Sequence, residues 1–248
     1  DGHPKIVVLS AMGGTTDSLE DITNYLSKDN KDAAREIAAE LERTYKGFAG
    51  KLFQSEEFRN RALEMIQSHF NHIRSFFYQS FSSAQEKSIM AQGELITSTL
   101  FHYMLEESNI DSVLLPALNF MRIDKNEEPD EFYIRENLQR ELSEKPDHNL
   151  FITQGYICRN AFGEVDNLKR GGSDYTASLI GAAIDADEIQ IWTDIDGFHN
   201  NDPRFVENTK KIEQLSFNEA AELAYFGAKI LHPQTVFPAR VQDIPVRL

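Results

Sequence analysis

Residues 169–178 have the sequence Lys-Arg-Gly-Gly-Ser-Asp-Tyr-Thr-Ala-Ser, in which two cations and paired glycines precede small polar residues. The apolar run 179–184 follows, which predicts that the glycines end a loop and open a helix. Glycine lets a backbone approach a ligand closely, and the free N–H groups of a helix start attract anions. A loop that binds a carboxylate or a phosphate is one interpretation, and a plain turn with a Ser or Asp N-cap is the other. The segments on either side decide between the two.

Short apolar runs alternate with helical patterns along the rest of the chain. The runs predict strands at residues 5–9, 112–115, 150–153 and 188–192, and a last strand beginning at Ile244. Helices are predicted after the turn at 12–17, over a helical segment at about 28–107, and at 216–226. The charged residues 124–131 predict a solvated loop. The alternation favours the α/β class, with a mainly parallel sheet covered on both faces and ligands at the carboxyl ends of its strands.

Composition excludes several classes of protein. The 248 residues suit one large α/β domain or two small ones. A formal net charge of −15 argues against nucleic-acid and membrane-surface partners, because binding to either needs a positively charged protein surface. No apolar run approaches the ~20 residues of a membrane span. The single cysteine, Cys158, excludes an internal disulfide and fits a reducing cytoplasm.

Several common catalytic motifs do not occur in the chain. The Walker A, GxGxxG and GxSxG patterns are absent. His69 and His72 lack the further ligands of a zinc site and are interpreted as surface histidines. The stretch Asp194–Gly197 lacks the spacing of an EF-hand, so a β-turn is the better interpretation.

Five segments occur together in a recognisable order. They are 8–17 (VLSAMGGTTD), 92–95 (QGEL), 169–177 (KRGGSDYTA), 191–194 (IWTD) continuing to 202–204 (DPR), and 222–233 (ELAYFGAKILHP). This set closely resembles the catalytic domain of the aspartokinases, which are members of the amino-acid kinase family. The resemblance covers most of the chain and is weakest over about residues 28–84. The stretch 119–125 (NFMRIDK) is most similar to the aspartokinases that are fused to homoserine dehydrogenase.

The resemblance implies one three-layer α/β/α sandwich over residues 1–248, a catalytic domain that is incomplete at both ends. The family's opening strand, with its Lys-Phe-Gly-Gly loop, has no counterpart here, and the C-terminal regulatory domains are missing. The implied reaction uses ATP and Mg²⁺ to phosphorylate the side-chain carboxylate of L-aspartate, giving 4-phospho-L-aspartate in the first step of lysine, threonine and methionine biosynthesis. A cytoplasmic homo-oligomer is expected, with a fused homoserine dehydrogenase in the full-length protein as a further expectation. No metal ligands are identified.

The resemblance also implies roles for individual residues. Arg170 would hold the substrate α-carboxylate with its planar guanidinium, and Glu94, helped by Asp174, would pair with the α-ammonium. The rest of the aspartate pocket would be shaped by Ser10, Ala11, Thr16 and Ser173. The nucleotide would lie at Thr193 and Asp194, near His199, with Arg204 and Lys229 at its phosphates. The expected catalytic residues are Asp174 and Lys229.

The implied chemistry agrees with these residue types. An aspartate carboxylate has a reference pKa of about 3.9, so the nucleophile is ionised at pH 7 and needs no general base. The enzyme must instead align two anions and neutralise the transferring phosphoryl group. Two alternatives stay open: a kinase of another amino-acid carboxylate such as glutamate, and a catalytically incomplete nucleotide-binding or oligomerisation module. One departure from the family pattern is the stretch 166–169 (DNLK), which replaces Thr-Thr-Leu-Gly and brings the charge of Asp166 close to a site for anions.

Overall fold

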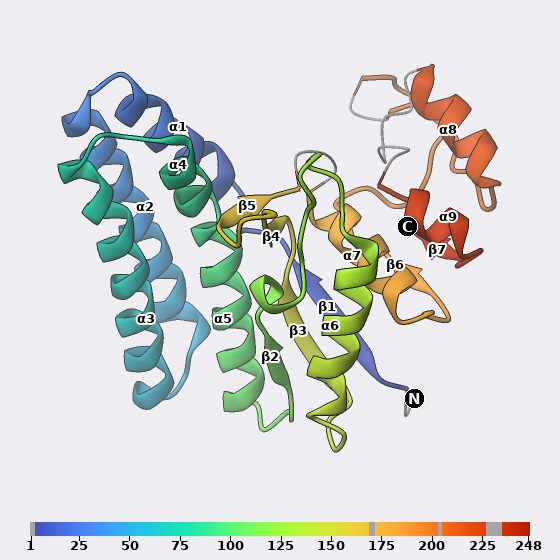
Figure 1. Ribbon diagram of the computed structural model, residues 1–248, viewed down its shortest axis with the longest axis horizontal. Helices are drawn as coiled ribbons and strands as arrows, with labels where there is room; N and C mark the ends of the chain where they lie inside the picture. The colour runs from blue at the N-terminus through green and yellow to red at the C-terminus, as the bar shows by residue number, and fades with distance from the viewer. Residues whose placement is uncertain (1–2, 169–171, 203–204, 227–234) are drawn as a thin grey trace.

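The structure is a computed structural model that describes residues 3–168, 172–202, 205–226 and 235–248. Figure 1 shows a central sheet with a group of long helices on one side and two helices on the other. A smaller part built from the C-terminal residues lies beside the second group of helices. The α/β class and the layered arrangement predicted from the sequence are confirmed.

The central sheet has three parallel strands in the order β1-β3-β2. They are β1 (Lys5–Leu9), β3 (Leu150–Gln154) and β2 (Val113–Leu115). Leu9 at the end of β1 pairs with Gln154 at the end of β3. Because the strands are parallel and in this register, the loops that follow β1 and β3 leave the sheet at the same edge.

Five helices form the layer on one side of the sheet (Figure 1). They are α1 (Thr15–Ser27), α2 (Lys31–Leu52), α3 (Glu56–Ser75), α4 (Ser83–Met90) and α5 (Gln92–Glu107), with a 3₁₀ turn η1 (Phe76–Tyr78) before α4. Side chains of Asn30, Ser55 and Ser82 cap α2, α3 and α4. Helix α5 packs on all three strands, and the other four build an apolar core around it. Helical structure begins at Thr15, in the predicted turn at 12–17, and continues with short interruptions to Glu107.

The opposite face of the sheet is covered by α6 (Glu131–Ser143) and α7 (Gly172–Ala183). Helix α6 begins after Asp130, whose side chain accepts a hydrogen bond from the backbone N–H of Tyr133 at 3.1 Å. The charged segment 124–131 ends at this cap, so its prediction as a loop is correct up to residue 130. The amphipathic pattern of α6 was not recognised in the sequence, because its charged residues continue those of the preceding loop.

An antiparallel hairpin joins the sheet to α7 and departs from the predicted parallel arrangement. Its strands are β4 (Ile157–Arg159) and β5 (Val165–Asn167). Gly163 in the connecting loop has φ +85°, a conformation that side chains disfavour. Each strand spans three residues, which is too short for a periodic pattern to reveal it in the sequence.

The C-terminal part contains a second parallel pair, β6 (Ile189–Gln190) and β7 (Val246–Arg247). Helices α8 (Phe217–Tyr225) and α9 (Phe237–Val241) belong to the same part, and a short 3₁₀ turn, η2 (Ala117–Asn119), follows β2. The predicted strands at 188–192 and from Ile244 are therefore present but shorter than expected. Within the described ranges, none of the helices combines the length and the apolar character that crossing a membrane requires.

Candidate active site

The loop after β1 is attached to the start of α5. The backbone N–H of Ala11 donates to Glu94 Oε1 at 3.3 Å, and that of Met12 donates to Thr97 Oγ1 at 3.1 Å. Gly14 ends the loop with φ +77° and stands at the N-cap of α1. The structure thus brings Ala11 and Glu94, two residues predicted for the aspartate pocket, into direct contact.

Gly93 allows this close approach of loop and helix. A Cβ atom at this position would lie 2.7 Å from Ala11 Cβ and 3.1 Å from Thr15 Cγ2. Thr15 is itself held from the other side, since its hydroxyl lies 2.9 Å from the hydroxyl of the fully buried Tyr45 on α2. The predicted residues Ser10 and Thr16 flank this anchored segment and are exposed.

The Tyr45–Thr15 hydrogen bond leads to a testable prediction for stability. Tyr45→Phe keeps the ring but leaves the buried Thr15 hydroxyl without this partner, so we expect the free energy of unfolding to fall by about 1 kcal/mol. Urea unfolding measures the change. The matched control is Tyr78→Phe, because that ring is 79 % exposed. Equal stability of the two variants would contradict the structural role of the Tyr45 hydroxyl.

Glu94 is a buried carboxylate in the first turn of α5, with 5 % of its surface exposed. Burial raises its pKa to about 7, and hydrogen bonds from its own backbone N–H and from that of Ala11 offset this only in part. Within the described part of the chain it forms no ion pair. A buried carboxylate without a counterion is unfavourable, and a cationic group bound beside it would relieve that cost.

The start of α7 lies against the end of β3. A Cβ atom on Gly155 would lie 2.7 Å from the backbone Cα of Ser173 and would also overlap its side chain. The N–H of Gly155 donates to the carbonyl of Leu9 at 2.9 Å, and the N–H of Tyr156 donates to Thr176 Oγ1 at 2.9 Å. The predicted residue Ser173 is therefore held at the edge where β1 and β3 end.

Asp174 follows Ser173 in the first turn of α7 and is half-buried. Burial raises the pKa of its carboxyl above the usual range. The structure thus places two predicted carboxylates, those of Glu94 and Asp174, at the starts of the two helices that border this edge.

Tyr156 is a residue of this region that the sequence analysis missed. Its backbone has φ +66°, which is rare for a residue with a side chain, and its ring packs between the two large apolar cores. Burial and the nearby carboxylates, Glu94 first among them, raise the pKa of its hydroxyl to about 12. The glycine at position 155, directly after the apolar run of β3, was the signal in the sequence that could have drawn attention to this turn.

The residues predicted to bind the nucleotide lie in the C-terminal part. Thr193 and Asp194 follow β6 and are exposed, with a hydrogen bond of 3.1 Å from Thr193 Oγ1 to Asp194 Oδ1. His199 is buried, and its ring nitrogens lie 2.7 Å from Asp196 Oδ1 and 2.9 Å from Thr209 Oγ1. These contacts engage the imidazole within its own loop, and its proposed place near the nucleotide stays a prediction.

Three predicted cations, Arg170, Arg204 and Lys229, lie outside the described residues. The described part of the chain contains no group of three or more His, Cys, Asp or Glu side chains that could hold a metal ion. No metal site is therefore assigned to the side chains of these described residues.

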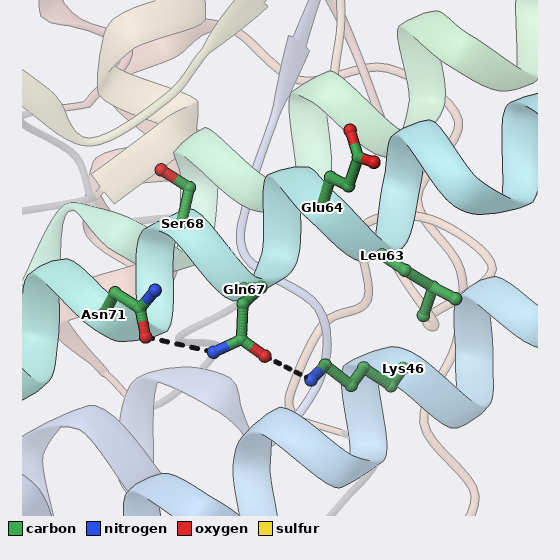
Figure 2. Close-up of a pocket in the computed structure, with 6 residues that line it drawn as sticks. All are labelled: Lys46, Leu63, Glu64, Gln67, Ser68 and Asn71. Atoms are coloured by element: carbon green, nitrogen blue, oxygen red, sulfur yellow. Dashed lines mark hydrogen bonds between the residues drawn. The ribbon is translucent and has the colours of Figure 1, made fainter.

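A surface hollow of about 500 Å³ lies between α2 and α3, and none of the predicted site residues that the structure describes lines it. Figure 2 shows how its polar side chains bind one another. Lys46 Nζ donates to Gln67 Oε1 at 2.6 Å, and Gln67 Nε2 donates to Asn71 Oδ1 at 3.0 Å. These three side chains bind one another, and Glu64 and Ser68 line the rest of the polar wall. A smaller hollow, of about 230 Å³, lies beside the glycine loop and is lined by residues 12–15 and by side chains of α2.

Comparison with known proteins places the chain in a family. A model of the amino acid kinase family matches residues 1–248. Lysine-sensitive aspartokinase 3 of Escherichia coli (strain K12) is 34 % identical over 254 residues, which cover 99 % of this chain and 55 % of that protein. The chloroplastic bifunctional aspartokinase/homoserine dehydrogenase 2 of Zea mays is 27 % identical over 252 residues, covering 98 % of this chain and 27 % of that protein.

A solved structure agrees with the sequence comparison. Aspartokinase III of Escherichia coli in complex with aspartate and ADP superposes with a TM-score of 0.79 and 31 % identity, covering 99 % of this chain and 55 % of that one. The chain thus spans about half the length of this relative or less. The resemblance to aspartokinases predicted from the sequence is confirmed, and the match over the whole sequence shows that the chain belongs to the amino acid kinase family.

Proposed function

We propose that this chain is the catalytic part of an aspartokinase, which transfers the γ-phosphoryl group of ATP to the side-chain carboxylate of L-aspartate. The observation that carries the proposal is the buried Glu94 carboxylate, which has no ion-pair partner within the described residues. It lies where the loop after β1 and the start of α5 meet, close to the turn that ends β3. An α-amino acid has an ammonium group that would pair with this carboxylate.

The substrate would lie at the edge where β1 and β3 end, between the starts of α5 and α7. Its ammonium would pair with Glu94, assisted by the half-buried Asp174, and its α-carboxylate would bind Arg170. Residues Ser10, Ala11, Thr16 and Ser173 would shape the rest of the pocket. The raised pKa of Glu94 supports this arrangement, because a cationic ligand would stabilise the ionised form.

The reaction needs no proton transfer from the protein. An oxygen of the substrate carboxylate attacks the γ-phosphorus, the bond from that phosphorus to the β–γ bridging oxygen breaks, and ADP leaves with the electron pair. Positioning and charge neutralisation then supply the catalysis. Arg204 and Lys229 would neutralise the phosphates, and Thr193, Asp194 and His199 would surround the adenosine part.

Magnesium would enter this site with the nucleotide. Its ligands would be mainly phosphate oxygens of the nucleotide, as is common for Mg²⁺. We assign no step to a metal held by the protein.

The larger organisation is also part of the proposal. Residues 1–248 would form one catalytic unit, since a single family match spans them. The bifunctional relatives support a fused homoserine dehydrogenase in the full-length protein, and a homo-oligomer remains a proposal from the sequence. The single, buried Cys158 favours a reducing compartment such as the cytoplasm.

A substitution of Arg170 tests the substrate assignment. Arg170→Ala is expected to abolish L-aspartate binding while sparing MgATP binding, because a guanidinium that holds the α-carboxylate in two hydrogen bonds has no substitute there. Arg170→Lys keeps the charge but loses the planar group that makes two hydrogen bonds to one carboxylate. We expect it to restore only a small part of the affinity. Calorimetric titration with L-aspartate, and with L-glutamate as control, measures both variants. Unchanged aspartate affinity in Arg170→Ala would overturn the assignment. Tighter binding of L-glutamate than of L-aspartate by the unsubstituted chain would identify glutamate as the substrate instead.

A further inference from the structure

An ion pair connects α4 to the hairpin strand β5. Lys87 Nζ lies 2.6 Å from Asp166 Oδ1, and the two side chains are 19 % and 17 % exposed. The same ammonium donates to Asn167 Oδ1 at 3.4 Å, and Asn167 is itself buried. The negative charge of Asp166, which in the sequence alone adds to the charge near an anion site, is therefore matched by a cation.

This ion pair holds the residues that precede the arginine-bearing loop. Strand β5 ends at Asn167, and the N–H of Leu168 donates to the carbonyl of Tyr156 at 2.7 Å. Residues 169–171 come next in the sequence, and the chain continues into Gly172 and Ser173 at the start of α7. The described residues on both sides of this loop are thus bound to neighbouring elements.

The other end of the ion pair belongs to the helix that leads to Glu94. Helix α4 ends at Met90, and Ala91 keeps helical dihedral angles of φ −68° and ψ −17°. The N–H of Ala91 donates to the carbonyl of Lys87 at 3.1 Å, and the N–H of Leu95 donates to the carbonyl of Ala91 at 3.3 Å. Helix α4 therefore runs into α5 almost without interruption, and Lys87 precedes Glu94 by about two helical turns.

We infer that Lys87 is a positioning residue for the amino-acid substrate. By binding Asp166 and Asn167 it holds the end of β5, three residues before Arg170 in the sequence, against the helix that leads to Glu94. Because these two groups would bind the ammonium and the carboxylate of one small molecule, a change in their separation would weaken both contacts together. Lys87 also keeps the Asp166 charge from repelling the two carboxylates of the substrate. The inference rests on the proposed function.

The test compares three variants of the full chain. Lys87→Met removes the cation but keeps most of the volume of the side chain, and Lys87→Arg keeps the charge. The matched control is Arg135→Met, which removes an ion pair of similar length between α6 and the end of α7, from Arg135 Nη1 to Asp185 Oδ2 at 3.0 Å. Calorimetry measures the Kd of L-aspartate and of MgATP, and amide hydrogen exchange measures the protection of residues 165–176.

We expect Lys87→Met to raise the Kd of L-aspartate by about tenfold or more, to leave that of MgATP unchanged and to speed exchange in residues 165–176. Lys87→Arg should restore most of the aspartate affinity, and Arg135→Met should change neither Kd. Two results would overturn the inference: an aspartate Kd in Lys87→Met no higher than in Arg135→Met, or an equal loss for both ligands.

Hydrogen exchange separates this inference from the proposed function. If the unsubstituted chain fails to bind L-aspartate, the proposed function loses its support in this chain, whereas the positioning role is still decided by exchange. Faster exchange confined to residues 165–176 in Lys87→Met would support that role, and exchange equal to that of the unsubstituted chain would overturn it.

Discussion

Glu94→Gln is expected to abolish detectable L-aspartate binding and, at the same time, to stabilise the folded chain above pH 7. The amide has almost the same shape as the carboxyl and keeps an oxygen that accepts the hydrogen bond from the N–H of Ala11. It has no charge to pair with a substrate ammonium. It also removes the cost of burying an ionised carboxylate.

The effect on stability depends on pH in a defined direction. The pKa of Glu94 is raised to about 7 in the folded chain from an ordinary value of 4.5. Between these values the folded state holds a proton that the unfolded state has released, so the stability due to this group falls as the pH rises from about 4.5 through 7. The difference between the two pKa values corresponds to a loss of about 3 kcal/mol. Glu94→Gln lacks this loss. Its free energy of unfolding should therefore equal that of the unsubstituted chain at pH 4 and exceed it most above pH 8.

Urea unfolding at pH 5 and pH 8, together with calorimetry of L-aspartate, measures both effects of Glu94→Gln. The control is Glu36→Gln, which removes an exposed carboxylate of α2 and should change neither quantity. Aspartate binding equal to that of the unsubstituted chain would overturn the proposed role of Glu94. Equal stability of the two variants at pH 8 would show that burial of the charge is not costly.

The unsubstituted chain should release a proton as it binds L-aspartate near pH 6.5. A bound ammonium favours the ionised form of Glu94, so the affinity should increase from pH 6 to pH 8 and level off above the pKa of about 7. Calorimetry in buffers with different ionisation enthalpies measures the number of protons released for each aspartate bound. This pH dependence should disappear if a residual affinity in Glu94→Gln can be measured.

Gly155→Ala is expected to weaken both the fold and the site. The added methyl group would lie 2.7 Å from the backbone Cα of Ser173, so either the end of β3 or the start of α7 must move. Overpacking of this kind costs about 1–3 kcal/mol. Because Ser173 and Asp174 move with α7, the Kd of L-aspartate should rise on the order of a hundredfold.

Gly50→Ala is the matched control for Gly155→Ala. Gly50 lies within α2, and an added Cβ there would meet no atom within 4 Å. Alanine should stabilise that helix by about 0.5–1 kcal/mol and leave the affinity for L-aspartate unchanged. A normal aspartate Kd in Gly155→Ala would show that the contact with Ser173 does not position the site.

The elements with strong local patterns could be predicted from the sequence. The apolar runs of β1 and β3 and the helical periodicity up to Glu107 are visible within short windows, because each residue's face is set by its own element. The helix that follows the paired glycines was predicted in the same way, and α7 begins at Gly172. The hairpin of β4 and β5 escaped prediction because each strand spans only three residues, which is too short to show a periodic pattern.

Contacts between residues far apart in the sequence could not be predicted from sequence patterns. Asp166 is an uncompensated charge in the sequence, and its partner Lys87 lies on α4, near the start of the helix that carries Glu94. Likewise, nothing near Gly155 in the sequence indicates that Ser173 would overlap an added methyl group. Such pairs depend on how the elements pack, and their spacing along the chain follows no local rule.

The sequence by itself determined the α/β class and the loops that follow the strands, because both depend on the periodicity and chemistry of nearby side chains. Its resemblance to the aspartokinases implied which charged residues would contact an amino acid and a nucleotide. The tertiary structure alone decided the environment of those residues. Burial at the meeting point of β1 and α5 raises the pKa of Glu94 to about 7, a property that arises only when surrounding elements exclude water from its carboxylate.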